Sequence, residues 1–180
     1  MTTEEYLQTP ETVLPQELAY GEWRVADSPS VSHQRVVLEL MLALVAFVRQ
    51  EQLGEVLIAP MDVILDFDNA LVVQPDLLFV SNERRDIISD RIHGAPDLAI
   101  EVLSPHPRIG RLDERVGWFA KYGVRECWLV NSEEKNVAVL SLSNAGVRAR
   151  TLHRGAQPIA SEVMKGLSLT PLQIFGYDRS

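Results

Sequence analysis

The stretches that decide the fold are Val72-Val-Gln-Pro-Asp-Leu-Leu-Phe-Val80 and Asp97-Leu-Ala-Ile-Glu-Val-Leu103. Both are rich in β-branched and large apolar residues, which is typical of strands inside a protein. Each carries an acid in mid-run, Asp76 in the first and Glu101 in the second. Because side chains alternate along a strand, Asp97 and Glu101 should share one face of the second stretch. A carboxylate inside an apolar strand costs free energy unless it is paired, hydrogen-bonded or bound to metal, so each acid needs a partner.

Apolar spacing predicts helices and strands on both sides of these stretches. Helical spacing extends over 32–52, with Ser32 as the expected N-cap, and over 110–122, with Gly123 as the expected C-cap. Residues 17–25 indicate a short hairpin. Strands are expected at 56–59, 61–65, 72–80, 97–103, 126–131, 137–142 and 147–153. Short turns favour antiparallel pairs and the strand-helix-strand unit adds a parallel one, so the fold class is α/β (α+β), a mixed sheet flanked by helices.

Length and composition indicate one folded domain. The chain has 180 residues, 46% of them hydrophobic, and can bury a core without disulfides or a structural metal. We expect a single domain over 1–180, with a lead-in at 1–30, a core at 32–153 and a C-terminal segment at 154–180. The single cysteine, Cys127, is expected to be a buried hydrophobic residue in a reducing compartment. The acidic start and the short apolar runs predict a cytoplasmic protein without a membrane span.

The charge balance argues against non-specific coating of nucleic acid. There are 17 Lys+Arg and 25 Asp+Glu, giving a formal net charge of -8, so no global positive field attracts a polyanion. A local basic groove stays open as an alternative because many basic residues concentrate in mid-chain: Arg84, Arg85, Arg108, Arg111, Arg115, Lys121 and Arg125. The glycine motifs of serine hydrolases, phosphate-binding loops and dinucleotide folds do not occur, which excludes those classes.

The acids allow a structural and a functional interpretation. Asp97 begins its strand after Pro96, which favours an ion pair or a solvent-facing carboxylate. For Asp76 and Glu101 we favour function, because two separate strands each place an acid in mid-run. The structural alternative pairs these acids with nearby arginines, namely Arg84, Arg85, Arg108 or Arg111.

The ordered motifs resemble the PD-(D/E)xK nuclease superfamily, since Pro75-Asp76 is followed 25 residues later by Glu101 in an apolar strand. More closely, the chain resembles the Uma-two family of restriction-endonuclease-like proteins, a family also labelled a domain of unknown function. The matching stretches extend over nearly the whole chain and are Met1–Leu7, Gly21-Glu22, Ser28–Ser30 with His33-Gln34, Val73–Val80, Gly94–Pro105 and Gly123–Val130.

The resemblance implies a Mg²⁺-dependent (or Mn²⁺-dependent) DNA endonuclease with a restriction-endonuclease-like core. In that site Asp76 and Glu101 hold the ion together with the backbone carbonyl of Val102. Hard oxygen ligands suit Mg²⁺, which can activate a water and neutralise charge on a phosphate. DNA is the implied partner, and a homodimer is expected only by analogy with nucleases that cut two strands.

The lysine of the superfamily motif is missing. Its place, two residues beyond the second acid, is taken by Leu103. In the Uma-two family the lysine comes from the next helix, in a Glu-Lys pair that aligns with Glu114-Arg115. Arginine stays protonated, so Arg115 is expected to hold a phosphate or transition-state oxygen and not to act as a general base. The alternatives are a surface ion pair for Arg115, and a catalytically degenerate nuclease fold that serves as a DNA- or protein-binding module.

Other candidates lie near these residues. Glu22 is considered as an outer carboxylate that orients a metal-bound water, and His33 as a capping or packing residue. Trp118 and Tyr122 are expected to be core or rim aromatics, with base stacking as the alternative. The loop 104–108 is expected to border the site.

Overall fold

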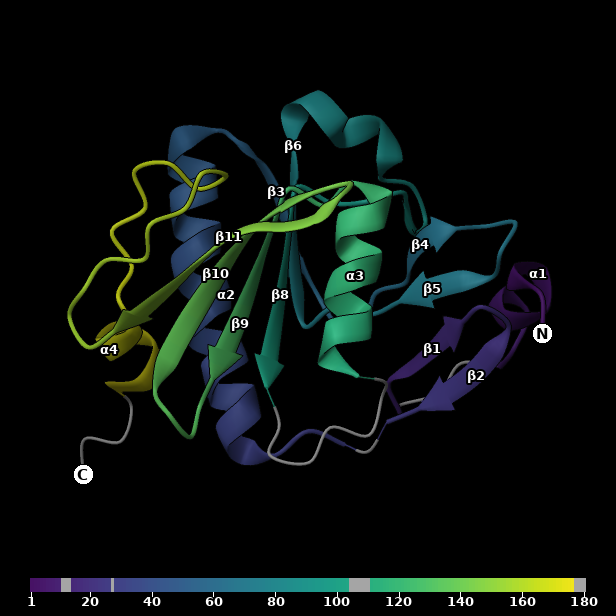
Figure 1. The fold of residues 1–180 in the computed structure, drawn as a ribbon, viewed down its shortest axis with the longest axis horizontal. Helices are drawn as coiled ribbons and strands as arrows, with labels where there is room; N and C mark the ends of the chain where they lie inside the picture. The colour runs from purple at the N-terminus through teal and green to yellow at the C-terminus, as the bar shows by residue number, and fades with distance from the viewer. Residues whose placement is uncertain (11–13, 27, 104–110, 177–180) are drawn as a thin grey trace.

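The computed structural model describes residues 1–10, 14–26, 28–103 and 111–176, and it contains two β-sheets flanked by helices (Figure 1). The larger sheet has six strands, in the order β11 (Gly146–Arg154), β10 (Asn136–Ser143), β9 (Glu126–Asn131), β8 (Leu98–Leu103), β6 (Leu77–Ser81) and β3 (Gly54–Ile58). All its neighbours pair antiparallel except β8 and β9, which are parallel. The predicted α+β class with a mixed sheet is confirmed.

The smaller sheet has five short strands, in the order β2 (Glu22–Val25), β1 (Gln16–Ala19), β5 (Leu71–Val73), β4 (Val63–Asp66) and β7 (Ile92–His93). Strands β1 and β2 form the predicted hairpin. Its turn residues Tyr20 and Gly21 both have positive φ, as a tight two-residue turn requires.

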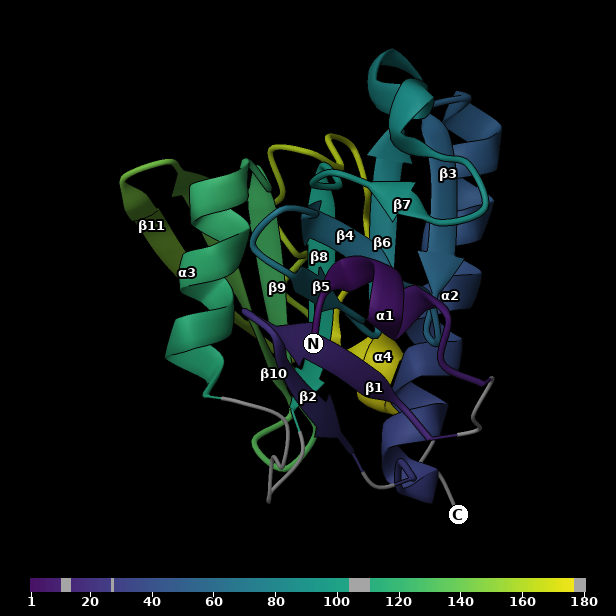
Figure 2. The same ribbon diagram turned by 90° about the vertical axis from the view of Figure 1, so that its right-hand side faces the viewer.

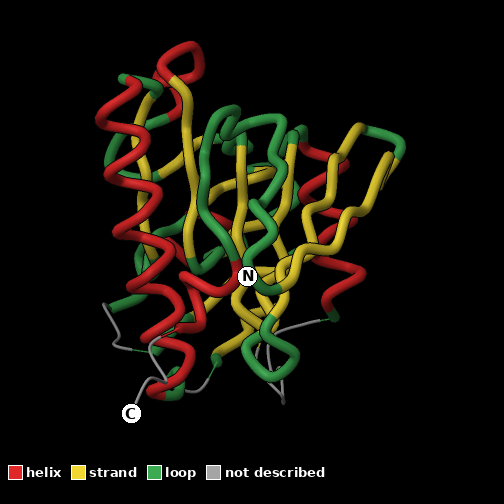
Figure 3. The backbone as a smooth tube through the Cα atoms, turned by 90° about the vertical axis from the view of Figure 1, so that its left-hand side faces the viewer, coloured by secondary structure: helices red, strands yellow, loops and turns green. Residues whose placement is uncertain are grey.

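The helices are α1 (Thr3–Leu7), α2 (Val31–Glu51), α3 (Leu112–Tyr122) and α4 (Pro171–Phe175), with a 3-10 helix η1 (Asn82–Ile87) after β6. Figure 2 shows α2 and α3 on opposite faces of the six-stranded sheet, and Figure 3 shows the same arrangement from the opposite edge of the molecule. The α3 helix is the crossover between the parallel strands β8 and β9, as predicted. Its expected start at Gly110 lies outside the described residues.

Alternating side chains of β8 supply both halves of the core. Ala99 packs in the cluster on the α3 side, whereas Leu98, Ile100 and Val102 pack in the cluster on the α2 side. Cys127 is fully buried on the α3 side. The predicted division of β8 into two faces is therefore confirmed, and Glu101 belongs to the α3 face.

The helix α2 begins at Val31 with Ser30 as its N-cap, so the prediction of Ser32 as the cap was wrong. The Ser30 hydroxyl accepts a hydrogen bond from the backbone N–H of His33 at 3.2 Å. By length and composition alone α2 could cross a membrane, and its buried stripe packs on the six-stranded sheet. That stripe consists of Val36, Leu40, Leu44 and Val48.

The predicted strand 72–80 is wrong in one respect that matters for the site. It is two strands, β5 and β6, which belong to different sheets and are separated by Gln74-Pro75-Asp76. Proline has no N–H to donate to a strand ladder, which explains the interruption at Pro75. Asp76 therefore lies just before β6, where its side chain is not confined to one face of a strand.

Candidate active site

Asp76 and Glu101 come together at one end of the six-stranded sheet. In the antiparallel pair of β6 and β8, Leu77 lies opposite Ile100, so Asp76 follows next to Glu101. The Asp76 Oδ2 atom accepts a hydrogen bond of 2.7 Å from the backbone N–H of Val102. The strand register thus places Asp76 beside Glu101 and Val102.

The second oxygen of Asp76 contacts His33, in the first turn of α2. The distance from His33 Nε2 to Asp76 Oδ1 is 3.2 Å. The other ring nitrogen, Nδ1, is buried and has no hydrogen-bond partner among the described residues. His33 thus does more than cap or pack the helix, the role expected from the sequence, because its ring also contacts Asp76.

Arg115 connects Glu101 to a third acid, Glu17 of β1. Its Nε atom donates to Glu101 Oε1 at 2.6 Å, and its Nη1 atom lies 2.6 Å from each carboxylate oxygen of Glu17. All three side chains are nearly buried, with exposed fractions of 10% for Arg115, 12% for Glu101 and 3% for Glu17. The alternative of a surface ion pair for Arg115 is therefore wrong, because its partners are the buried acids Glu101 and Glu17.

Glu17 is a site residue that sequence reasoning missed. The hairpin 17–25 was predicted, but its first residue was not considered as part of the site. Besides Arg115, Glu17 Oε1 accepts a hydrogen bond of 2.7 Å from the backbone N–H of Gln74. An acid at the start of the apolar run Glu17-Leu18-Ala19 was the signal that could have found it.

Burial and charge shift the pKa of the central groups. Burial raises the pKa of Glu101 to about 8, the carboxylates of Asp76 and Glu17 add to the rise, and Arg115 opposes it. Burial lowers the pKa of Arg115, but Glu101 and Glu17 outweigh it and raise that pKa overall. Glu101 and Glu17 both contact the Arg115 guanidinium and Asp76 lies next to Glu101, so the three carboxylates outnumber the one guanidinium when they are ionised.

This donor set fits a hard divalent cation. Among the residues that the structure describes, no group of three or more His, Cys, Asp or Glu side chains could hold a metal ion. Mg²⁺ does not need such a group, because it keeps several waters and binds through one or two carboxylates. Asp76 and Glu101 supply two hard oxygen donors beside surplus negative charge, so they could hold such an ion.

The remaining candidates have other partners. Asp97 is fully buried, accepts from the backbone N–H of Ser81 at 2.8 Å and lies 3.2 Å from Arg125, so its predicted pairing role is confirmed. Glu22 is 67% exposed and pairs with Arg24. The other arginines considered as partners of Asp76 and Glu101 pair elsewhere: Arg84 with Asp97, Arg85 with Glu55 and Arg111 with Asp113.

The aromatic residues of α3 are used within the fold. Trp118 is buried and meets the ring of Tyr20 edge-on, with 5.9 Å between the ring centroids. The Tyr122 hydroxyl donates to Asp66 Oδ2 at 2.7 Å. These contacts agree with the prediction of core and rim aromatics. Arg108 and the rest of the loop 104–108 lie outside the described residues.

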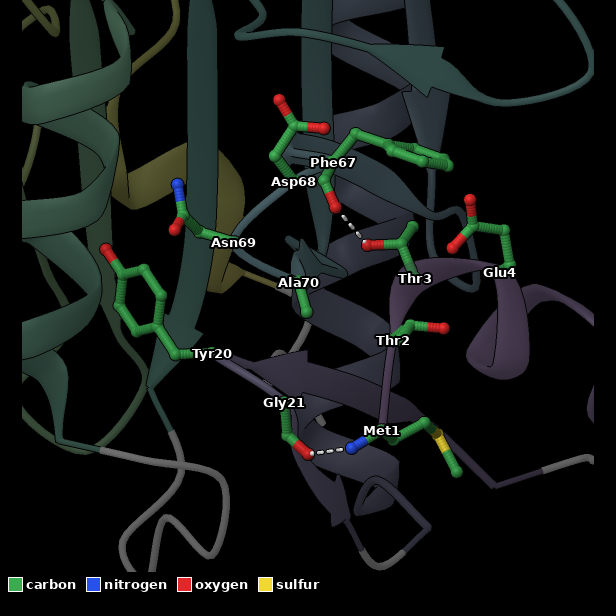
Figure 4. A pocket seen from close by; sticks show the side chains of 10 residues that line it. All are labelled: Met1, Thr2, Thr3, Glu4, Tyr20, Gly21, Phe67, Asp68, Asn69 and Ala70. Carbon is green, nitrogen blue, oxygen red and sulfur yellow. Dashed lines mark hydrogen bonds between the residues drawn. The ribbon is translucent and has the colours of Figure 1, made fainter.

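A surface pocket lies away from these acids, where the start of α1 meets the turns β1–β2 and β4–β5 (Figure 4). Its volume is about 360 Å³. Two hydrogen bonds hold its wall together, from the Met1 amino group to Gly21 O at 3.0 Å and from Thr3 Oγ1 to Phe67 O at 2.7 Å. None of the acids of the candidate site lines this pocket, so it does not bear on their chemistry.

Comparison with known proteins identifies the family and the fold. The model of the family Uma2, described as "Putative restriction endonuclease", matches residues 3–172. The crystal structure of "a putative nuclease belonging to DUF820 from Anabaena variabilis" is similar, with a TM-score of 0.83 and 18% sequence identity over 98% of each chain. At that identity the likeness concerns the fold alone. No curated protein matches the chain.

Proposed function

The chain belongs to the Uma2 family of restriction-endonuclease-like proteins, and from this premise we propose that it is a divalent-cation-dependent endonuclease that hydrolyses phosphodiester bonds in DNA. The observation that carries the proposal is the meeting of Asp76 and Glu101 at one end of β6 and β8, inside a cluster whose carboxylates outnumber its guanidinium. Two convergent carboxylates with surplus negative charge are what a Mg²⁺-assisted phosphodiesterase needs.

Asp76, Glu101 and the carbonyl of Val102 would hold Mg²⁺ or Mn²⁺. When bound, the ion supplies a bound water of lowered pKa and neutralises charge that develops on the phosphate. The protein prepares Asp76 for this role from two sides, since the Val102 N–H holds one carboxylate oxygen and His33 contacts the other. Such partners orient a ligating carboxylate before the ion arrives.

Arg115 is the positive group that we propose for the scissile phosphate. Its Nε and Nη1 atoms donate to the two acids, and the two N–H groups of Nη2 could donate to a phosphate oxygen. The N-termini of α2 and α3 lie at the same end of the molecule as the tip of β8 (Figure 1). The positive ends of these helix dipoles would favour a phosphate there.

The test is cleavage of supercoiled plasmid DNA by the wild-type protein with Mg²⁺ or Mn²⁺. We expect Asp76→Asn and Glu101→Gln each to reduce cleavage at least 100-fold, and Glu114→Gln to cleave like wild type. Glu114 is the matched control because it is an acid on α3, next to Arg115, that pairs with Arg24 outside the cluster. Absence of cleavage with both cations, or cleavage by Asp76→Asn at the wild-type rate, would overturn the proposal.

A second candidate is a catalytically degenerate module that keeps the nuclease fold to bind DNA or another protein. It is favoured by Leu103 in place of the superfamily lysine and by the two carboxylates that hold Arg115. If the wild type is inactive and Arg115→Lys cleaves DNA, loss of the lysine explains the degeneracy. If that variant neither cleaves DNA nor binds Mn²⁺, the metal site itself is absent, and the search turns to binding partners.

A further inference from the structure

Glu17 is not itself in contact with Asp76 or Glu101, the proposed metal ligands. It contacts Arg115, which pairs with Glu101, and Gln74, which lies two residues before Asp76. Its carboxylate oxygens lie 2.6 Å from Arg115 Nη1, and Arg115 in turn donates to Glu101. Its Oε1 atom also accepts from the backbone N–H of Gln74, two residues before Asp76. A single buried carboxylate therefore connects the helix that pairs with Glu101 to the segment that carries Asp76.

Glu17 also reduces how far the positive charge of Arg115 neutralises Glu101. If Glu101 were the sole partner of Arg115, the pair would be close to neutral, and Asp76 alone would attract a cation. Because Glu17 lies as close to the guanidinium as Glu101 does, the positive charge is shared between two acids. Interactions between such buried groups are only weakly screened by solvent. A cation binds the ionised form of Glu101, and in that form the carboxylate thus keeps part of its negative charge for the ion.

We infer that Glu17 is a positioning residue of the site, which holds Arg115 and thereby sets the negative charge that Asp76 and Glu101 present to a divalent cation. This inference rests on the proposed function, because it concerns the same cation site. A purely structural role for Glu17 predicts something different: its loss would lower stability and leave the cation affinity of the folded protein unchanged.

The experiment is calorimetric titration of Mn²⁺ into the full-length protein and its folded variants. Glu17→Gln keeps the size of the side chain and removes its charge, so Arg115 should neutralise Glu101 more completely. We expect Mn²⁺ affinity to fall about tenfold or more. Arg115→Gln should have the opposite effect and raise the affinity. The control is Glu114→Gln, which removes an acid from the partly exposed pair between the hairpin and α3, and should change the affinity less than twofold.

The outcomes separate this inference from the proposed function. If the wild type binds Mn²⁺ and Glu17→Gln binds it equally well, the inference fails and the metal site stands. If the wild type binds no Mn²⁺, the cation part of the proposed function fails and the inference fails with it.

Glu17→Asp covers the case in which Glu17→Gln does not fold. Aspartate keeps the charge, but it is one methylene shorter and cannot span Arg115 and Gln74 as glutamate does. We expect a weakening of Mn²⁺ affinity of about two- to fivefold, smaller than for a neutral side chain. Wild-type affinity in the aspartate variant would overturn the inference.

Discussion

Glu17 of β1 and Arg115 of α3 are 98 residues apart in the sequence and meet at 2.6 Å with both side chains nearly buried. A second ion pair joins the other strand of the same hairpin, β2, to α3 with the opposite polarity. Arg24, the cross-strand neighbour of Glu17, reaches Glu114 at 3.2 Å. One pair is buried and the other is partly exposed. The effect of burial on an ion pair can therefore be compared at one junction, between the hairpin and α3.

The buried pair should matter far more to stability than the exposed one. We predict that Arg115→Met lowers the free energy of unfolding by about 3–5 kcal/mol, because Glu101 and Glu17 are left buried without their counter-charge. Arg24→Met breaks the partly exposed pair and should cost at most about 1 kcal/mol. Urea denaturation at pH 7 measures both. Equal losses in the two variants would mean that burial of the Glu17–Arg115 contact adds nothing to the free energy of unfolding.

The stability of the protein should fall as the pH rises from about 5 to 8. The pKa of Glu101 is about 8 in the folded protein, against an ordinary value of 4.5. Between these values the folded chain binds more protons than the unfolded chain, so the free energy of unfolding decreases with pH, by up to roughly 1 kcal/mol per unit. Urea denaturation at pH 5, 6.5 and 8 measures this slope.

The matched variant for this slope is Glu101→Gln. Glutamine is neutral at every pH in the range, so the variant should lose the part of the slope that Glu101 causes. A wild-type stability that rises between pH 5 and 8 would contradict the prediction. In that case Glu101 would be ionised in the folded protein and its pairing with Arg115 would outweigh its burial.

The meeting of Asp76 and Glu101 could be anticipated from the sequence because it depends on local patterns. Alternation along β8 assigns Glu101 to a face, and apolar runs bounded by turn residues mark the strands. The break at Pro75 was missed, since the apolar residues on both sides fit one strand equally well. They belong to β5 and β6, in two different sheets, and that choice is made by tertiary packing.

The contacts of Glu17 and His33 could not be anticipated in the same way. The contact of His33 with Asp76 depends on how α2 packs against the segment before β6. Strand β1, which carries Glu17, is four residues long, too short to give a periodic signal, and pairs with β5 far along the chain. Such strands are stable only through the rest of the fold. Arg115 adds a second difficulty, because a charged residue on a helix is normally exposed, and its buried partners come from two different sheets.

Two acids that look alike in sequence should differ in what they do for stability. Asp97 is fully buried and accepts from Ser81 N–H and Arg125, so Asp97→Asn should cost about 1–3 kcal/mol. Asp76→Asn keeps an oxygen for the Val102 N–H and removes a charge that repels Glu101. Its stability without metal should therefore equal that of wild type within about 1 kcal/mol.

Thermal or urea denaturation in the presence of a chelator measures these two variants. A loss for Asp76→Asn as large as that for Asp97→Asn would show that Asp76 is held by a structural pair. The structural interpretation of the acids would then extend to Asp76, and its proposed role as a metal ligand would have to be given up.

The edge strand β3 provides a test of the sheet itself. Gly54 pairs with Ser81 of β6, and a Cβ atom on Gly54 would lie 2.1 Å from the backbone oxygen of Val80 and 2.8 Å from Ser81 Cα. Both are backbone atoms of the neighbouring strand and cannot move aside alone. We predict that Gly54→Ala lowers the free energy of unfolding by about 2–4 kcal/mol, because the two strands must separate locally.

The same substitution in α3 should have the opposite sign. Gly117 is exposed, lies within the helix, and a Cβ atom added there would meet nothing within 4 Å. Alanine is the better helix former by roughly 1 kcal/mol, so Gly117→Ala should stabilise the protein. Denaturation of the two variants in parallel removes any general effect of the glycine-to-alanine change. If Gly54→Ala is as stable as wild type, β3 does not pair with β6 in this register, and the position of β3 at the edge of the six-stranded sheet is wrong.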